Sequence, residues 1–239
     1  MKTIIKYTRF TFYMIGTIFK RLKYEKLNKK YGNEEAEKYL DKILLDWVKF
    51  CISLIKIKVS TEGAENIPEG NFLVVANHQG NLDIPCIIYS LNRRMGFIAK
   101  KEMENIPLIS YWMKKINCVF MDRENIREAV KSINKGVEIL KSGNVLAIFP
   151  EGTRSRGSKM GEFKKGSLKL GTKAQVLILP IAINGSYKIM EESHGWNIKE
   201  GEVKIKISKP INTENLSLEE IKELPSVVER IIRENLNEL

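Results

Sequence analysis

Alternation of short apolar runs with helical stretches, from residue 55 onward, is the feature that most constrains the fold of this chain. Seven runs are typical of strands, because each is short, apolar or alternating, and most are bounded by turn residues. They cover residues 55–60, 72–77, 95–100, 117–122, 144–150, 176–183 and 203–208. Helical patterns lie between or after them, at residues 84–91, 107–116, 124–142, 164–174 and 216–236. This alternation predicts an α/β domain whose central, largely parallel sheet is flanked by helices.

Residues 1–55 precede this pattern and are typical of two helices. The second helix is expected to begin at Asn33, a common N-cap residue that is followed by glutamates suited to a first helical turn. Apolar residues then recur at helical spacing as far as Ile55. We therefore expect a helical hairpin over residues 1–55 and an α/β domain over residues 56–239.

Positive charge is concentrated at the N-terminus. The chain carries a net charge of +11, and residues 1–30 hold nine Lys and Arg against only Glu25, which leaves +3 for the remaining 209 residues. A nucleic-acid binder would spread its charge differently and would show a recognisable module, so no nucleic-acid partner is expected. The uncharged run Phe10–Phe19 has ten residues, whereas a membrane span needs about 20. Basic residues follow this run at the place where a signal peptide would have its cleavage site, so we do not expect the chain to be exported.

Two interpretations of the first helix remain open. In the first, the helix lies on an anionic leaflet at the cytoplasmic face of the membrane, with its lysines at the headgroups. Five side chains would then enter the lipid: Phe10, Phe12, Tyr13, Ile15 and Phe19. In the second, the helix packs on the protein's own core. The basic and aromatic composition favours the first interpretation, a peripheral membrane-associating hairpin.

His78 is the histidine best placed for chemistry. It follows the run 72–77 in the segment NHQGNLD, with Asp83 five residues further on. On one continuous helix, a five-residue spacing rotates side chains by about 140°, so the two would not share a face. If the loop turns at Gly80 and a helix begins near Asp83, the carboxylate folds back onto the imidazole and makes His78 a general base. The alternative is a simple helix N-cap at Asp83 and a loop histidine.

A second group of residues follows another expected strand, in the segment FPEGTRSRG. Glu151, Gly152, Thr153 and Arg154 emerge at the carboxyl end of the run 144–150, where open α/β sheets bind ligands. Glycine allows backbone amides to approach a ligand, and the guanidinium fork matches a phosphate. Other strands deliver further cations to the same edge, among them Lys100 and Arg123. The convergence of these cations predicts an anionic substrate.

Four segments together resemble the glycerolipid acyltransferases typified by bacterial 1-acylglycerol-3-phosphate acyltransferase. NHQGNLD resembles the family's Asn-His-x-Ser-x-x-Asp motif, with Gly80 where serine is usual. INCVFMDR is similar to its Gly-x-x-Phe-x-x-Arg motif, with Asn117 at the glycine position. FPEGTRS matches the third motif in full, and VLILPIAI resembles the fourth. The four occur in the family's order over residues 76–183, after the expected helical hairpin.

The resemblance implies transfer of an acyl group from acyl-CoA or acyl-carrier protein to the sn-2 hydroxyl of lysophosphatidic acid, giving phosphatidic acid. His78 would take the hydroxyl proton, and Asp83 would orient His78. Backbone N–H groups, that of Gly152 first, would meet the oxyanion. The acceptor would be bound by the remaining candidates: Lys100, Arg123, Glu151, Thr153 and Arg154. The basic segment 156–165 is an alternative contact for coenzyme A.

The same resemblance implies direct transfer without cofactors. The sequence has no GxSxG elbow and no cysteine beside His78, which argues against a covalent acyl-enzyme. No metal or prosthetic group is needed, and the three scattered cysteines form neither a disulfide framework nor a zinc motif. Two alternatives remain: the same reaction on another lysophospholipid, or a non-enzymatic, basic membrane-surface protein in which these segments are structural loops.

Overall fold

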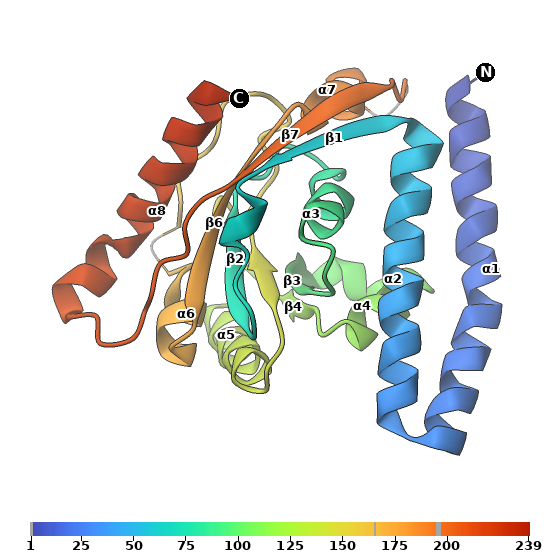
Figure 1. Cartoon of the computed structure of the whole chain (residues 1–239), viewed down its shortest axis with the longest axis horizontal. Helices are drawn as coiled ribbons and strands as arrows, with labels where there is room; N and C mark the ends of the chain where they lie inside the picture. Colours follow the sequence, from blue (N-terminus) through green and yellow to red (C-terminus); the bar gives the residue numbers. More distant parts are fainter. Residues whose placement is uncertain (1, 165, 195–196) are drawn as a thin grey trace.

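The computed structural model describes residues 2–164, 166–194 and 197–239, and it has the expected α/β architecture (Figure 1). Within these described residues, seven strands form one sheet in the order β1-β7-β6-β2-β5-β3-β4. Their bounds are β1 (Ile57–Glu62), β2 (Phe72–Ala76), β3 (Gly96–Lys100), β4 (Val119–Met121), β5 (Leu146–Ile148), β6 (Leu177–Asn184) and β7 (Gly201–Ile207).

The sheet is largely parallel, as the sequence predicts. Strands β6, β2, β5, β3 and β4 run in one direction, whereas β7 pairs antiparallel with β6 and β1 runs parallel to β7. The carboxyl ends of the five parallel strands therefore meet at a single edge of the sheet. The candidate site residues lie at this edge, in the loops that follow β2, β4 and β5 and, for Lys100, at the last residue of β3.

Helices cover both faces of the sheet. Their bounds are α1 (Lys2–Tyr31), α2 (Asn33–Ile55), α3 (Asp83–Leu91), α4 (Ile109–Lys115), α5 (Ile126–Lys141), α6 (Lys169–Ala174), α7 (Ser186–Ile189) and α8 (Leu218–Glu238). Short 3₁₀ turns occupy residues 64–66, 101–105 and 191–193. Figure 1 shows α8 on one side of the sheet and the α2 and α3 helices on the other.

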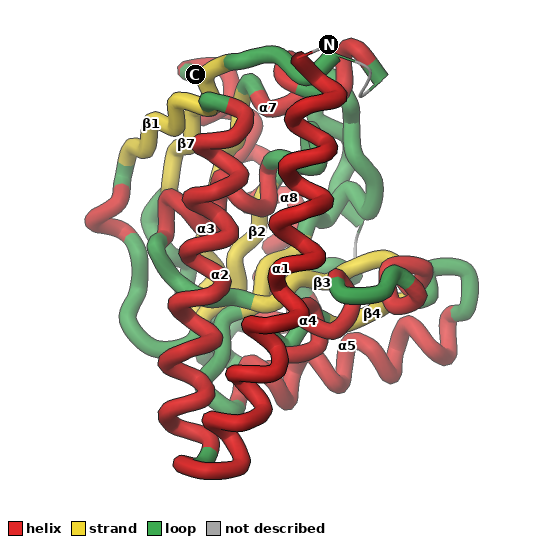
Figure 2. Tube along the Cα trace, turned by 90° about the vertical axis from the view of Figure 1, so that its right-hand side faces the viewer, coloured by secondary structure: helices red, strands yellow, loops and turns green. Residues whose placement is uncertain are grey.

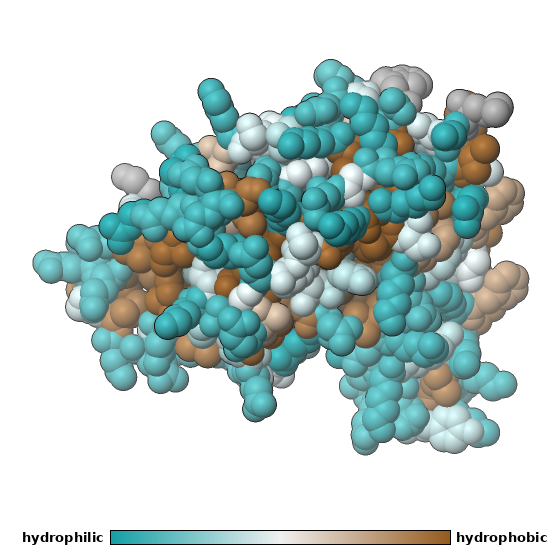
Figure 3. Space-filling model, turned by 45° about the horizontal axis from the view of Figure 1, so that its top comes forward, coloured by the Kyte–Doolittle hydropathy of each residue, from teal (hydrophilic) through white to brown (hydrophobic). Residues whose placement is uncertain are grey.

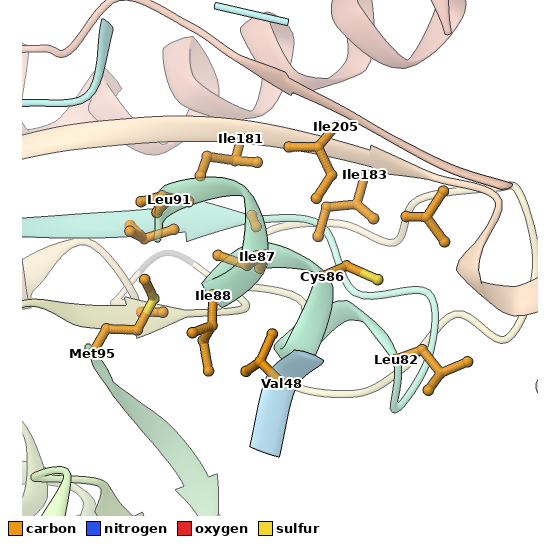
Figure 4. Close-up of a cluster of buried hydrophobic side chains, with 14 of the residues drawn as sticks. Val48, Leu82, Cys86, Ile87, Ile88, Leu91, Met95, Ile181, Ile183 and Ile205 are labelled. Atoms are coloured by element: carbon orange, nitrogen blue, oxygen red, sulfur yellow. The ribbon is translucent and has the colours of Figure 1, made fainter. Parts of the chain in front are cut away.

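Alternate residues of β2 explain how one strand builds two cores. Phe72 and Val74 belong to a cluster with side chains of α2 and α3. Val48 and Ile87 of this cluster are labelled in Figure 4. The intervening Leu73 packs in a second cluster with residues of α5, α6 and α8. All five residues of β2 are buried, which is why the strand appears in the sequence as a continuous apolar run.

Several expected boundaries differ from the structure by a few residues, and at the two ends of α2 the backbone shows the reason. Asn33 is the first residue of α2, and Gly32, with φ of 83°, precedes it, because a left-handed turn residue must reverse the chain there. The first strand begins at Ile57, since Ile55 completes α2 and Lys56 is its left-handed cap. Pro225 lies inside α8, which continues on both sides of it as one helix.

The helical hairpin is confirmed, and α1 packs along α2 (Figure 2). Tyr13, expected in lipid, instead stacks on Phe50 of α2 with ring centroids 4.0 Å apart. Burial beside Asp46 raises the pKa of Tyr13 to about 12. Phe12 and Phe19, by contrast, are 69% and 74% exposed. No helix within the described residues combines the length and apolarity that crossing a bilayer requires.

Candidate active site

His78 and Asp83 form a hydrogen-bonded pair at the carboxyl edge of the sheet. The chain turns after β2, and α3 begins at Asp83, so the carboxylate folds back onto the imidazole as the sequence predicts. His78 Nδ1 lies 2.7 Å from Asp83 Oδ2. Leu82, not Asp83, is the N-cap of α3, so the N-cap alternative does not describe this site.

Asp83 is fully buried and is surrounded by donors. Its Oδ2 accepts the N–H groups of Gln79 and Gly80 at 2.7 and 2.8 Å, and its Oδ1 accepts the hydroxyl of Ser186. This donor set suits a carboxylate, which only accepts. The His78 proton therefore belongs on Nδ1, facing Asp83, and Nε2 keeps the lone pair that a general base needs.

Phe149 covers one face of the imidazole. The two rings stack with centroids 3.9 Å apart and planes 12° from parallel. Phe149 itself packs against the hydrophobic cluster that contains Phe97. The His78 side chain retains 16% exposure, so the ring is held from one side and from Nδ1 while part of it stays open to a substrate.

Glu151 joins two loops of the site. Its Oε1 accepts the backbone N–H of His78 at 2.6 Å, and its Oε2 accepts the N–H of Gly161 at 2.7 Å. Burial raises the pKa of this carboxyl, while the two N–H bonds act in the opposite direction. Since both oxygens accept backbone N–H groups, Glu151 organises the loops around His78.

The loop after Glu151 lies directly on the loop of His78. The N–H of Ser155 donates to the carbonyl oxygen of His78 at 2.8 Å, and the N–H of Arg156 donates to that of Gln79 at 3.2 Å. These bonds place Arg154 in the segment adjoining the His78–Asp83 pair. The structure therefore confirms that the segments NHQGNLD and FPEGTRS meet at one edge of the sheet.

Gly152 is the centre of a cationic cluster. Its φ of 71° suits glycine, and an added Cβ would lie 2.8 Å from Lys164 Nζ. The Arg123 guanidinium donates to the carbonyl oxygen of Gly152. Lys164 comes from the basic segment that the sequence offers as a contact for coenzyme A; Lys165 of that segment lies outside the described residues.

Two expectations need adjustment. The N–H of Gly152 donates to the carbonyl oxygen of Phe149 at 3.0 Å, so it is engaged in the turn and does not await an oxyanion. Lys100 is exposed and pairs with Glu102 at 2.7 Å, which diverts its charge from the cluster. Thr153 is exposed in the same turn. In Figure 3 hydrophilic side chains cover much of the face, with apolar patches between them and at the right-hand edge, the side on which Figure 1 shows α1.

Ser186 and Glu191 are site residues that the sequence did not reveal. Ser186 follows the Asn-Gly turn at the end of β6, where Gly185 has φ of 98°. That turn was the available signal, because parallel strands end at the same edge. Glu191 lies in a three-residue 3₁₀ turn, which is too short for any periodic pattern. Within the described residues, no group of three or more His, Cys, Asp or Glu side chains is placed to hold a metal ion.

Comparison with known proteins agrees with this geometry. The Acyltransferase family model matches residues 58–184. The probable 1-acyl-sn-glycerol-3-phosphate acyltransferase of Mycoplasma pneumoniae is 35% identical over 187 residues, which cover 76% of this chain and 68% of that protein. Its namesake in Mycoplasma genitalium is 36% identical over 200 residues, covering 79% and 73%.

A solved structure is also similar over the whole chain. The crystal structure of the 1-acyl-sn-glycerophosphate (LPA) acyltransferase from Thermotoga maritima has a TM-score of 0.82 and 33% identity, covering 100% of this chain and 97% of that one. The family match spans more than half of the chain and includes both the His78–Asp83 pair and the cationic turn. This protein therefore belongs to the acyltransferase family.

Proposed function

We propose that the protein transfers an acyl group from an acyl thioester to the sn-2 hydroxyl of 1-acylglycerol-3-phosphate, producing phosphatidic acid. The observation that carries this proposal is that a histidine held by a carboxylate, His78, lies on a loop hydrogen-bonded to the loop of the cationic cluster around Gly152. Relatives named as 1-acyl-sn-glycerol-3-phosphate acyltransferases support the choice of acceptor. Family membership also favours an enzyme over the non-enzymatic alternative.

In the proposed first step, His78 acts as the general base. Nε2 takes the proton of the sn-2 hydroxyl while its oxygen attacks the thioester carbonyl carbon. Asp83 holds Nδ1–H and stabilises the imidazolium that forms, and Phe149 keeps the ring in place. A positioned base of this kind contributes about 10²- to 10⁴-fold to the rate.

In the second step, the tetrahedral intermediate collapses and the carbon–sulfur bond breaks. The thiolate leaves readily because a thiol pKa is about 8.5, and the proton held by His78 can pass to it. Since Gly152 N–H is engaged, the oxyanion donors are assigned to the next amides, those of Thr153 and Arg154. Neither N–H has an acceptor among the described residues.

The acceptor phosphate is assigned to Arg123 and Arg154, with Lys164 beside them. A guanidinium offers a planar fork of donors that matches phosphate oxygens. Arg123 already touches Gly152, and Arg154 lies on the loop that is hydrogen-bonded to His78. This arrangement would fix the phosphate of the acceptor at a set distance from the base.

Membrane association is assigned to the hairpin, residues 1–55, at the cytoplasmic face where acyl thioesters are made. Apolar side chains on one face of α1 are exposed instead of packing on α2: Ile4, Phe12, Ile15, Phe19 and Leu22. Their spacing of three, four and eight residues places them on one stripe of the helix. The nine cations of residues 1–30 add attraction to an anionic leaflet.

Thiol release is the decisive assay. The purified chain is mixed with acyl-CoA or acyl-carrier protein and with lysophosphatidic acid, lysophosphatidylcholine or lysophosphatidylglycerol in turn. Release with lysophosphatidic acid alone is the expected result. Equal thiol release with an acceptor that lacks a terminal phosphate would redirect the proposal to another lysophospholipid. If none of the three acceptors supports thiol release, acyl transfer to lysophospholipids is refuted.

A further inference from the structure

Glu191 places a buried carboxyl group beside the catalytic loop without belonging to the catalytic pair. Its side chain is 4% exposed. Oε1 accepts the backbone N–H of Asn81 at 2.8 Å, whereas Oε2 has no hydrogen-bond partner among the described residues. A buried, unpaired carboxyl oxygen costs free energy, so its retention at this edge calls for a functional reason.

Gly80 provides the space that Glu191 occupies. A Cβ at position 80 would lie 2.7 Å from Glu191 Oε1 and closer still to Oε2. The N–H of Gly80 meanwhile donates to Asp83, and the N–H of Asn81 donates to Glu191. Two successive amides of the loop that carries His78 are therefore held by two different carboxyl groups.

Arg154 is the cation that faces Glu191, with its NH1 3.7 Å from Oε1. Burial is the main cause that raises the pKa of Glu191, and the negative charge of Asp83 adds to it. The N–H of Asn81 and the charge of Arg154 lower it. Arg154 and Asp83 are thus the charged groups that act on this carboxyl.

We infer that Glu191 is a positioning residue for the acceptor: it holds Arg154 against the loop of His78, so that the bound phosphate and the base keep a fixed separation. The inference rests on the proposed function, because it takes Arg154 as a phosphate ligand. Glu191 touches neither the phosphate nor the reacting atoms. Its carboxylate acts through Arg154 on one side and through Asn81 on the other.

Glu191→Gln tests this role with little change of volume. The amide oxygen still accepts the N–H of Asn81, but the charge that faces Arg154 is gone. We expect the acceptor KM to rise about threefold to tenfold, as for loss of a partly buried ion pair, while kcat stays within about twofold. Glu192→Gln is the matched control, since Glu192 is exposed and lies 3.8 Å from Lys199.

The pH dependence separates positioning from a merely structural effect. As pH falls through the raised pKa of Glu191, the wild-type carboxyl becomes neutral and resembles glutamine. The ratio of variant to wild-type acceptor KM should therefore fall toward one at low pH. A ratio that stays constant with pH, or an unchanged KM in Glu191→Gln, would overturn the positioning role. Absence of turnover by the wild type with every lysophospholipid would instead overturn the proposed function.

The contact between Gly80 and Glu191 is tested by a double-mutant cycle that measures thermal unfolding and does not depend on enzyme activity. Gly80→Ala should lower the thermal unfolding midpoint, because the new methyl group displaces Glu191. In the Glu191→Ala background the same substitution should cost much less, since the carboxyl group is gone. Additive effects of the two substitutions would contradict the packing on which the inference depends.

Discussion

The Asp83 carboxylate receives hydrogen bonds from three separate residues besides His78, and this shows how the site is built at the scale of single residues. Gln79 and Gly80 lie in the same loop, whereas Ser186 is 103 positions away in the sequence. These donors fix the carboxylate before any substrate binds. His78 can then be oriented by one well-defined partner.

Replacing His78 should abolish most of the activity. His78→Ala removes the proposed base, so turnover should fall by about two to four orders of magnitude. Asp83→Asn should also be severely impaired while still folding, because the amide is a poor partner for Nδ1–H. Thiol release measures both. His194→Ala is the control, as His194 is exposed in a turn; near-normal turnover in His78→Ala would contradict the mechanism.

Replacing the guanidinium groups should affect acceptor binding selectively. Arg154→Ala and Arg123→Ala each remove a charge-assisted contact worth about 1.5–3 kcal/mol, so the acceptor KM should rise about 10-fold or more. The KM for the acyl thioester should change much less. Arg154→Lys should restore the acceptor KM only in part, because an ammonium lacks the bidentate fork.

Saturation curves with lysophosphatidic acid provide the measurement for these arginine variants. Arg156→Ala is a useful comparison, since Arg156 lies in the same basic loop and is exposed. If the thioester KM rises instead of the acceptor KM, the cationic turn contacts the carrier's phosphates. The assignment of the lysophosphatidic acid phosphate to Arg123 and Arg154 would then be wrong.

At the scale of helices and strands, an element was predictable from the sequence when its pattern of apolar residues extended over several residues. β2 was predictable because its five residues are all buried, and β7 because its buried residues alternate with partly or fully exposed ones. The 3₁₀ turn that carries Glu191 has three residues and no period to detect. Glu191 reaches Asn81 across 110 positions of sequence, and only tertiary packing establishes such a contact.

Turn geometry explains the other differences. Asn33 has the side chain of an N-cap, but the reversal between α1 and α2 needs a residue with positive φ, and Gly32 supplies it. The hydrogen bond between His78 and Asp83 was predictable, because a histidine oriented by this carboxylate requires the loop to fold back at Gly80. The hydrogen bond from the Gly152 N–H to the carbonyl oxygen of Phe149 was not predictable, since it depends on which carbonyl oxygen the turn brings within reach.

The exposed face of α1 leads to a prediction for that helix. Phe12→Ser/Phe19→Ser should weaken binding to anionic vesicles strongly, because it removes two exposed aromatic side chains without disturbing the Tyr13–Phe50 contact. Sedimentation with vesicles measures the effect. Leu218→Ser is the control, since Leu218 is 78% exposed on α8. Wild-type binding by the double variant would favour the alternative in which α1 serves only to cover the core.

Charge should contribute separately to the same binding. Residues 1–30 hold nine cations, each worth about 1 kcal/mol when well placed at an anionic surface. The full chain should therefore bind vesicles more weakly at high salt without being released, because shallow apolar insertion does not depend on ionic strength. Complete release by salt alone would mean that the apolar face of α1 does not enter the lipid.

At the scale of the whole molecule, the start of α1 adjoins the segment that leads away from the active site. Thr3 accepts the N–H of Ile198 at 3.2 Å, and Lys6 donates to the carbonyl oxygen of Ile198 at 3.0 Å. Ile198 lies seven residues after Glu191. The N-terminal end of the hairpin and the carboxyl edge of the sheet therefore share one end of the molecule (Figure 1).

This arrangement predicts that the hairpin matters for activity only when the acceptor is in a bilayer. Extracting lysophosphatidic acid into water costs about 0.8 kcal/mol per exposed methylene, and a site resting on the leaflet avoids most of that cost. Phe12→Ser/Phe19→Ser should therefore lower turnover of vesicle-borne acceptor by about tenfold or more. With detergent-dispersed acceptor, turnover should stay within about twofold of wild type, because the fold and the His78–Asp83 pair are untouched. Equal losses in both assays would mean that the substitutions damage the site, and no loss in either would mean that α1 does not deliver the site to lipid.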